Sequence, residues 1–146
     1  MKKLCIIFGS LCFLALMSAC SVYMAAKQPD QKNLHVLDKG TPRSYVISEL
    51  GPAMYTKKED GKSCDILSFV QGYSTGAKVG RAVFHGAADV LTLGIWEVAG
   101  TPIEAVADGT PIKVEVYYDE KDCVDFIKPI QGEDELKDVT SYKKSN

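Results

Sequence analysis

The sequence has few of the residues from which most catalytic and metal sites are built. Its 146 residues include two histidines and one tryptophan. Three common catalytic motifs are absent from it: Gly-x-Ser-x-Gly, His-Glu-x-x-His and the glycine loop that binds phosphate. We therefore expect neither a hydrolase of the nucleophile-elbow type, nor a zinc protease, nor a P-loop enzyme. The sequence predicts no catalytic residue, no metal site and no cofactor.

Positive charge is also scarce. Lysine and arginine together number 17 against 19 acidic residues, which gives a formal net charge of −2. Proteins that bind nucleic acid neutralise its phosphates with a strongly basic surface. The charge balance therefore predicts no nucleic-acid partner, and a mildly acidic body would be repelled by anionic lipid head groups.

The first 20 residues have the features of a bacterial lipoprotein signal. Two lysines precede an uncharged apolar run, Ser18 and Ala19 supply the small residues needed for cleavage, and Cys20 follows directly. A thiol at that position can receive a diacylglycerol. We therefore expect residues 1–19 to be a signal peptide and Cys20 to carry the lipid that anchors the protein at the membrane. Ser21, rather than aspartate, resembles the residue that directs lipoproteins to the outer membrane, facing the periplasm.

Two alternatives to this interpretation are a plain signal peptide and an uncleaved N-terminal anchor. The anchor is disfavoured because the apolar run from Leu4 to Ala19 has 16 residues, whereas a spanning helix needs about 20.

Three of the five cysteines belong to the leader or its cleavage site, and two belong to the rest of the chain. Cys5, Cys12 and Cys20 lie in or beside the leader, so the remaining chain keeps Cys64 and Cys123. Two cysteines in an oxidising compartment are a candidate disulfide, and we predict that these two are bonded. They are too far apart for a Cys-x-x-Cys redox pair, and a free, buried pair is the alternative.

Residues 20–40 are largely polar after Met24 and lack sustained periodicity, so they are predicted to form a flexible, lipidated tether. An α+β domain is expected over residues 41–130. It opens with a helix that has Thr41 as its N-cap, Pro42 at the first helical position and Gly51 at its end.

Three strands are predicted in this domain, at residues 64–70, 111–118 and 123–128. The second alternates apolar and polar side chains, as a half-buried strand does, and the segment Lys57–Lys62 is interpreted as a polar turn. These elements predict an α+β fold with a small antiparallel three-stranded sheet packed by helices. Residues 131–146 are polar and charged, and they are expected to be a disordered tail.

A glycine-rich helical insertion, residues 72–108, separates the first and second predicted strands. Its first helix is predicted to start after Ser74 and to end near Leu91. A further short helix is predicted from Thr101, which forms a capping box with Glu104. Between residues 82 and 107 the ionisable groups are few: Asp89, Glu97, Glu104 and His85.

Three interpretations of the insertion remain open. Its helices can cover a face of the sheet, contact a partner protein, or lie against the membrane, where Trp96 would suit the interface. The four-residue spacing of the glycines predicts a smooth groove for close packing, so leucine there should lower stability or abolish partner binding. The candidate interface residues are Gly72, Gly76, Gly80 and Trp96.

Several segments together resemble the BamE (SmpA/OmlA) family of outer-membrane lipoproteins. They are the lipidated cysteine, a polar tether, a helix that carries Gly40-Thr41 and Leu50-Gly51, and a later strand ending Val116-Tyr117-Tyr118-Asp119. The resemblance covers about half of the chain after the leader. It implies two helices on a three-stranded antiparallel sheet and a role beside the machine that inserts β-barrel proteins. The family has no counterpart of residues 72–108.

The function expected from these features is that of a lipid-anchored envelope protein, a non-catalytic scaffold or interaction module with an envelope protein as partner. Outer-membrane protein assembly or envelope integrity is the expected setting. The alternative is a small envelope enzyme or ligand-binding lipoprotein that uses His85 and Asp89, which lie one helical turn apart.

Overall fold

The computed structural model describes residues 20–59 and 61–143, and the predicted signal peptide lies outside the described residues. The chain forms two compact units. The helical unit consists of residues 20–30 and 72–109, and the sheet unit consists of residues 31–71 and 110–143 as far as they are described. The predicted insertion is therefore part of a separate unit that also includes the start of the predicted tether.

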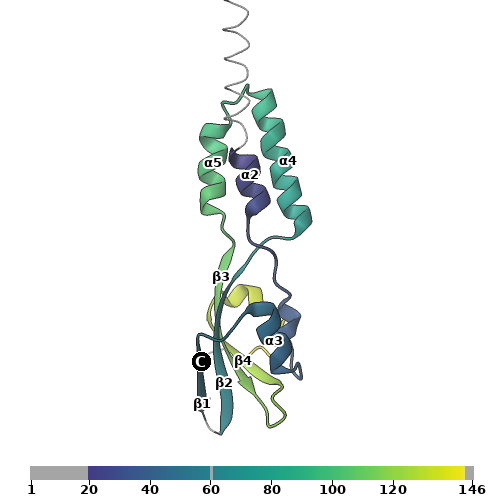
Figure 1. Cartoon of the computed structure of the whole chain (residues 1–146), viewed down its shortest axis with the longest axis vertical. Coiled ribbons are helices and arrows are strands. Elements are labelled where there is room, and N and C mark those ends of the chain that lie inside the picture. The colour runs from purple at the N-terminus through teal and green to yellow at the C-terminus, as the bar shows by residue number, and fades with distance from the viewer. Residues whose placement is uncertain (1–19, 60, 144–146) are drawn as a thin grey trace, which may run out of the picture. The chain divides into compact units, whose positions relative to one another are not determined.

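The sheet unit is built on four antiparallel strands in the order β1-β2-β3-β4 (Figure 1). Their bounds are β1 Tyr55–Glu59, β2 Lys62–Gln71, β3 Thr110–Tyr118 and β4 Val124–Gln131. The α+β class and the antiparallel pairing are confirmed. The expected count of three strands is wrong because the segment interpreted as a polar turn contributes β1, whose Lys57 pairs with Cys64 of β2. A strand with alternating half-exposed polar residues gives no hydrophobic signal.

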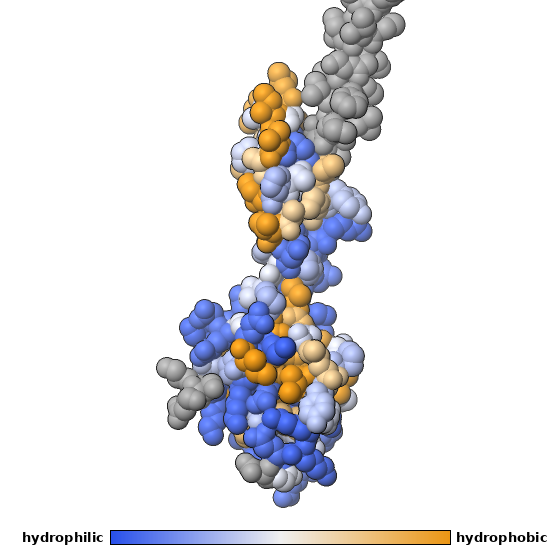
Figure 2. Space-filling model, turned by 90° about the vertical axis from the view of Figure 1, so that its left-hand side faces the viewer, coloured by the Kyte–Doolittle hydropathy of each residue, from blue (hydrophilic) through white to orange (hydrophobic). Residues whose placement is uncertain are grey.

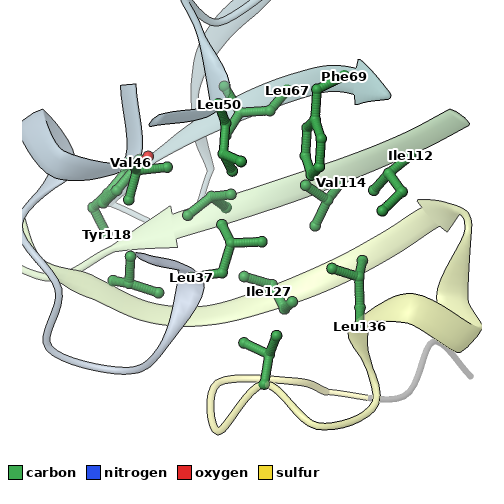
Figure 3. Close-up of a cluster of buried hydrophobic side chains, with 13 residues drawn as sticks. Leu37, Val46, Leu50, Leu67, Phe69, Ile112, Val114, Tyr118, Ile127 and Leu136 are labelled. Carbon is green, nitrogen blue, oxygen red and sulfur yellow. The ribbon is translucent and has the colours of Figure 1, made fainter. Parts of the chain in front are cut away.

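One face of the sheet carries the hydrophobic core (Figure 3). Alternate residues of β2 and β3 point to it, and helix α3, Arg43–Leu50, covers them together with two 3₁₀ helices, η1 (Leu34–Leu37) and η2 (Glu133–Leu136). The buried residues at its centre are Leu37, Val46, Leu50, Leu67, Phe69, Val114, Ile127 and Leu136. Burial of each such side chain contributes about 1.5–3 kcal/mol.

Helix α3 is attached to the sheet by a partly buried ion pair. Arg43 donates from Nε and Nη2 to the two oxygens of Asp65, at 2.8 and 2.6 Å, and Asp65 is fully buried. The helix begins one residue later than expected, with Pro42 as the N-cap and no side-chain cap. Gly51 ends it with φ 96°, a left-handed value that glycine adopts at little cost.

The predicted tether and tail are both ordered where the structure describes them. Helix α2, Cys20–Lys27, belongs to the helical unit, and η1 places Leu37 in the sheet core. At the other end Leu136 and Val139 are buried, and Ile127 N–H donates to Ser141 C=O at 2.9 Å. Both segments are too short for periodicity to reveal them, and contacts with distant residues order them. Residues 144–146, the last of the predicted tail, lie outside the described residues.

The helical unit consists of α2, α4 (Thr75–Leu91) and α5 (Glu97–Val106), with α2 between the other two (Figure 1). The predicted cap is confirmed, because Ser74 Oγ accepts from Ala77 N–H at 3.2 Å. The expected helix start at Thr101 is wrong: α5 begins at Glu97 and contains Pro102. Among the described residues, no helix is both long and apolar enough to cross a membrane.

Candidate functional site: a polar cluster inside the helical unit

The interior of the helical unit is mainly polar. Its buried residues include one alanine, Ala25, and five polar or charged side chains, Ser21, Gln28, His85, Asp89 and Glu104. Helix α2 supplies the serine, the residue directly after α2 is the glutamine, α4 supplies the histidine and aspartate, and α5 supplies the glutamate. Buried polar groups are costly unless they are hydrogen-bonded, so their partners decide what this cluster does.

His85 is held by hydrogen bonds at both ring nitrogens. Its Nδ1 accepts from Trp96 Nε1–H at 2.9 Å, which places the ring proton on Nε2. Nε2 then donates to Glu104 Oε1 at 2.8 Å. With both nitrogens occupied and the ring buried, His85 has no lone pair directed at a substrate.

Glu104 is fully buried and accepts hydrogen bonds from Gln28, Arg81 and His85. Arg81 Nη2 lies 2.9 Å from its Oε1, so a guanidinium balances the charge of the carboxylate. Gln28 Nε2 donates to its backbone carbonyl at 2.9 Å. The Arg81 guanidinium also lies 4.5 Å from the centre of the Tyr73 ring. Glu104 of α5 thus connects α4 with the residue that follows α2.

A second group of polar residues lies around Glu97. Ser21 donates to its carboxylate through both its backbone N–H, at 2.8 Å, and its hydroxyl, at 2.7 Å, and Thr101 donates at 2.8 Å. Partial burial would raise the pKa of Glu97, but these hydrogen bonds outweigh it and lower that pKa. Glu97 therefore stays ionised and fixes the first turn of α2 to α5.

Asp89 differs from the other acids of the cluster. Neither of its buried carboxyl oxygens has a hydrogen bond of ordinary geometry to the described residues. Burial raises its pKa, and the negative charge of the neighbouring Glu97 raises it further. Both effects oppose ionisation of Asp89, and protonation removes the buried charge and supplies a donor for Glu97.

This geometry favours a structural role for the cluster. The sequence pairs His85 with Asp89, whereas the structure pairs it with Glu104, 19 residues away. The only sequence signal for this arrangement is that Arg81 and His85, four residues apart, share a face of α4. Among the described residues there is no group of three or more His, Cys, Asp and Glu side chains that could hold a metal ion.

The predicted interface glycines are in different surroundings. A methyl group added at Gly76 or Gly80 would meet no atom within 4 Å, so neither glycine permits a close approach within the described structure. At Gly72 it would lie 2.0 Å from the Pro29 carbonyl oxygen, where residues 29–30 run beside residues 72–73. Trp96 faces the cluster through its Nε1. The four predicted residues therefore do not form one surface.

The two predicted disulfide cysteines are unbonded in the structure. Cys64 is buried in β2, and burial raises the pKa of its thiol. Cys123 is half-buried beside the hairpin turn, with Sγ 3.6 Å from the Lys121 carbonyl oxygen. A disulfide between Cys64 and Cys123 stays a prediction.

Many apolar side chains are exposed on the face of the helical unit seen in Figure 2, whereas its interior is mainly polar. In residues 82–107 every acidic side chain takes part in the internal cluster, and there is no lysine or arginine. The large apolar side chains left exposed are Val79, Val83, Phe84, Val90, Leu91, Leu93, Ile95, Val98, Ile103 and Val106. A unit surrounded only by water is expected to have the opposite arrangement.

Comparison of the chain with known protein families, with curated proteins and with solved structures finds no match.

Proposed function

We propose that this protein is a lipid-anchored envelope protein that acts as a non-catalytic interaction module. The observation that carries the proposal is the position of Cys20, which is exposed at the start of α2. Its neighbour Ser21 is fixed by two hydrogen bonds to Glu97. A lipid on Cys20 would therefore hold a folded unit directly at the membrane, rather than through a flexible tether.

The polar cluster supports a non-catalytic role over the alternative of an envelope enzyme. An enzyme that used His85 would need a ring nitrogen within reach of a substrate, and both nitrogens are engaged inside the unit. A cleft of about 470 Å³ exists in the sheet unit, and it is lined by other residues, including Lys32, His35 and Glu135.

The sheet unit offers a surface for a protein partner at strand β1. This strand is an edge of the sheet, and Met54 and Tyr55 are exposed at its start. The opposite edge, β4, is covered by the bridge between Ile127 and Tyr142. An uncovered edge strand can pair with another chain, so we assign partner binding to β1. The resemblance to BamE lipoproteins makes the β-barrel assembly machine of the outer membrane the first partner to test.

Acylation of Cys20 is tested by blocking it. Globomycin treatment or Cys20→Ser is expected to leave the protein unprocessed, because the thiol that receives the diacylglycerol is lost or the signal peptidase is inhibited. Metabolic labelling with a palmitate analogue and the size of the protein on a gel provide the readouts. Cys12→Ser, a change within the leader, is the matched control and should be processed normally. Unchanged labelling and size after Cys20→Ser would reject the lipid anchor.

Partner binding through β1 is tested with a photo-crosslinking phenylalanine derivative at Tyr55, which keeps an aromatic ring there. We expect a discrete adduct with an envelope protein after irradiation of intact cells. The same group at Lys121, exposed in the β3–β4 hairpin, is the control and should give none. Mass spectrometry of the adduct separates a barrel-assembly component from another envelope protein. Equal adducts from both positions, or none from Tyr55, would reject β1 as the contact surface.

A further inference from the structure

Five of the exposed apolar residues gather at one end of the helical unit. They come from the end of α4, the turn that follows it and the beginning of α5, and we call them the apolar tip. Their exposed fractions are among the largest of the apolar side chains: Val90 77%, Leu91 84%, Leu93 77%, Ile95 74% and Val98 81%.

The N-terminus of α2 lies at the same end of the unit as the apolar tip. Ser21 is hydrogen-bonded to Glu97, the first residue of α5, whereas Gln28 is hydrogen-bonded to Glu104 near the end of α5. Helices α2 and α5 therefore run in the same direction, and Cys20 lies beside the start of α5. The tip and Cys20 thus share one end.

The opposite end of the unit is charged. Lys78, near the start of α4, donates to the Gln28 carbonyl oxygen at 3.1 Å and forms an ion pair with Asp30. Lys27 is exposed at the end of α2. Among the described residues the end with the apolar tip has no exposed charged side chain, whereas the opposite end combines charged groups with exposed apolar residues such as Val106.

We propose that the apolar tip inserts into the acyl layer of a lipid bilayer beside the Cys20 lipid. Hydrocarbon accepts an apolar surface without charges, and groups that cannot be solvated there must find partners inside the protein. Between residues 82 and 107 the acids Asp89, Glu97 and Glu104 take part in the internal cluster, and His85, Glu104 and Arg81 satisfy one another. Binding to a second copy or to a protein partner would not require the apolar tip to lie at the same end of the unit as Cys20.

The backbone of the tip supports the proposal. Leu93 has φ 54°, a left-handed conformation that leucine rarely adopts, and it is followed by Gly94 with φ 85°. This turn leaves a large apolar side chain exposed at the extreme end of the unit. Backbone strain of this kind persists where the surroundings maintain it. Burial of the Leu93 side chain in lipid would offset the energetic cost of this conformation.

The depth of insertion is limited to one leaflet. Helix α4 has 17 residues and is about 26 Å long, which is less than the roughly 30 Å of the hydrocarbon core. Its first turns carry Lys78 and Arg81, which favour the head-group region. Insertion thus involves the tip and the adjoining turns of α4 and α5.

Trp96 is the only tryptophan of the chain and lies next to the tip residue Ile95, so its fluorescence reports depth without a label. The full chain is mixed with vesicles of phosphatidylcholine and phosphatidylglycerol whose acyl chains carry bromine, a contact quencher. We expect at least a twofold loss of Trp96 emission relative to unbrominated vesicles, together with protection from aqueous acrylamide. Emission that is unchanged by brominated lipid would overturn the proposal.

Charged variants separate the tip from the rest of the chain. Val98→Asp and Leu91→Asp should abolish most of the bromine quenching, because a carboxylate resists entry into lipid. Met54→Asp, at an exposed apolar residue of the sheet unit, is the matched control. Its Trp96 emission should be quenched by brominated lipid as strongly as that of the wild type. Val98→Ser, a milder change, should give an intermediate loss. Equal quenching in all four variants would contradict insertion of the tip.

The proposal concerns the same membrane as the lipid anchor but can fail separately from it. If the acylated protein stays on vesicles while its Trp96 is unquenched, the anchor stands and tip insertion is rejected. If Cys20→Ser in the full chain leaves quenching intact, insertion stands without acylation. A dimeric mass with Trp96 shielded from both quenchers would assign the tip to a second copy and overturn the proposal.

Discussion

Asp89 is the least compensated of the buried polar residues in the helical unit. His85 and Glu104 each have partners at hydrogen-bond distance, whereas the carboxyl oxygens of Asp89 have none of ordinary geometry among the described residues. Its raised pKa follows from burial and from the charge of Glu97. Because the pKa of Asp89 is higher in the folded than in the unfolded state, the folded protein binds more protons. Stability therefore falls as pH rises from 3.8, the ordinary pKa, to the raised pKa of the folded state.

Replacement of Asp89 by asparagine is expected to stabilise the protein at pH 7 by about 1 kcal/mol, because a buried charge is removed and the amide can donate to Glu97. The gain should shrink as pH falls towards and below 3.8, the ordinary pKa of aspartate, where both states of the wild type are protonated. Urea unfolding followed by Trp96 fluorescence at several pH values measures this. Asp108→Asn, at an exposed position of the same unit, is the control. A loss of stability at pH 7 would contradict the assignment.

At the scale of elements, spacing in the sequence and position in the fold identify different glycines as important for packing. The four-residue repeat draws attention to Gly76 and Gly80, which face open space. Gly100, outside that repeat, lies where α5 passes the cluster. A methyl group there would be 3.0 Å from both His85 Nδ1 and Trp96 Nε1 and 3.2 Å from Ser21 Cβ.

Alanine at these positions should therefore act in opposite directions. Gly80→Ala is expected to raise the free energy of unfolding by up to about 1 kcal/mol, because alanine favours the helix and displaces nothing. Gly100→Ala should lower it by about 1–3 kcal/mol through crowding of His85 and Trp96. Thermal and urea unfolding of the two variants against the wild type give the signs. A stabilising Gly100→Ala would show that the contact between α2 and α5 is looser than described.

At the scale of the whole molecule, one chain holds two units with opposite polarity. The sheet unit places Leu67, Val114 and Ile127 inside and, apart from the buried Asp65, keeps its described charged residues at least partly exposed. The helical unit places His85, Asp89 and Glu104 inside and many of its valines and leucines outside. A polar interior and an apolar exposed surface suit contact with lipid, which is what the proposal for the helical unit rests on, whereas the apolar core of the sheet unit suits water.

The sequence by itself determined the local features of the chain. Alternation identified strand β3, Ser74 identified the start of α4, and Gly51 identified the end of α3, because these signals depend on neighbouring residues alone. The α+β class and the antiparallel sheet followed from them. The fourth strand escaped prediction because half-exposed polar residues carry no pattern.

Tertiary structure decided what α2, the C-terminal segment and the buried polar residues do. Helix α2 is ordered by bonds from Ser21 and Gln28 to residues 76 positions away, and Leu136 is ordered by the sheet core. The partnership of His85 with Glu104, like the inward direction of the acids, depends on how three helices pack. No local pattern contains such contacts, because the free energy that selects them comes from burial and hydrogen bonding between distant parts of the chain.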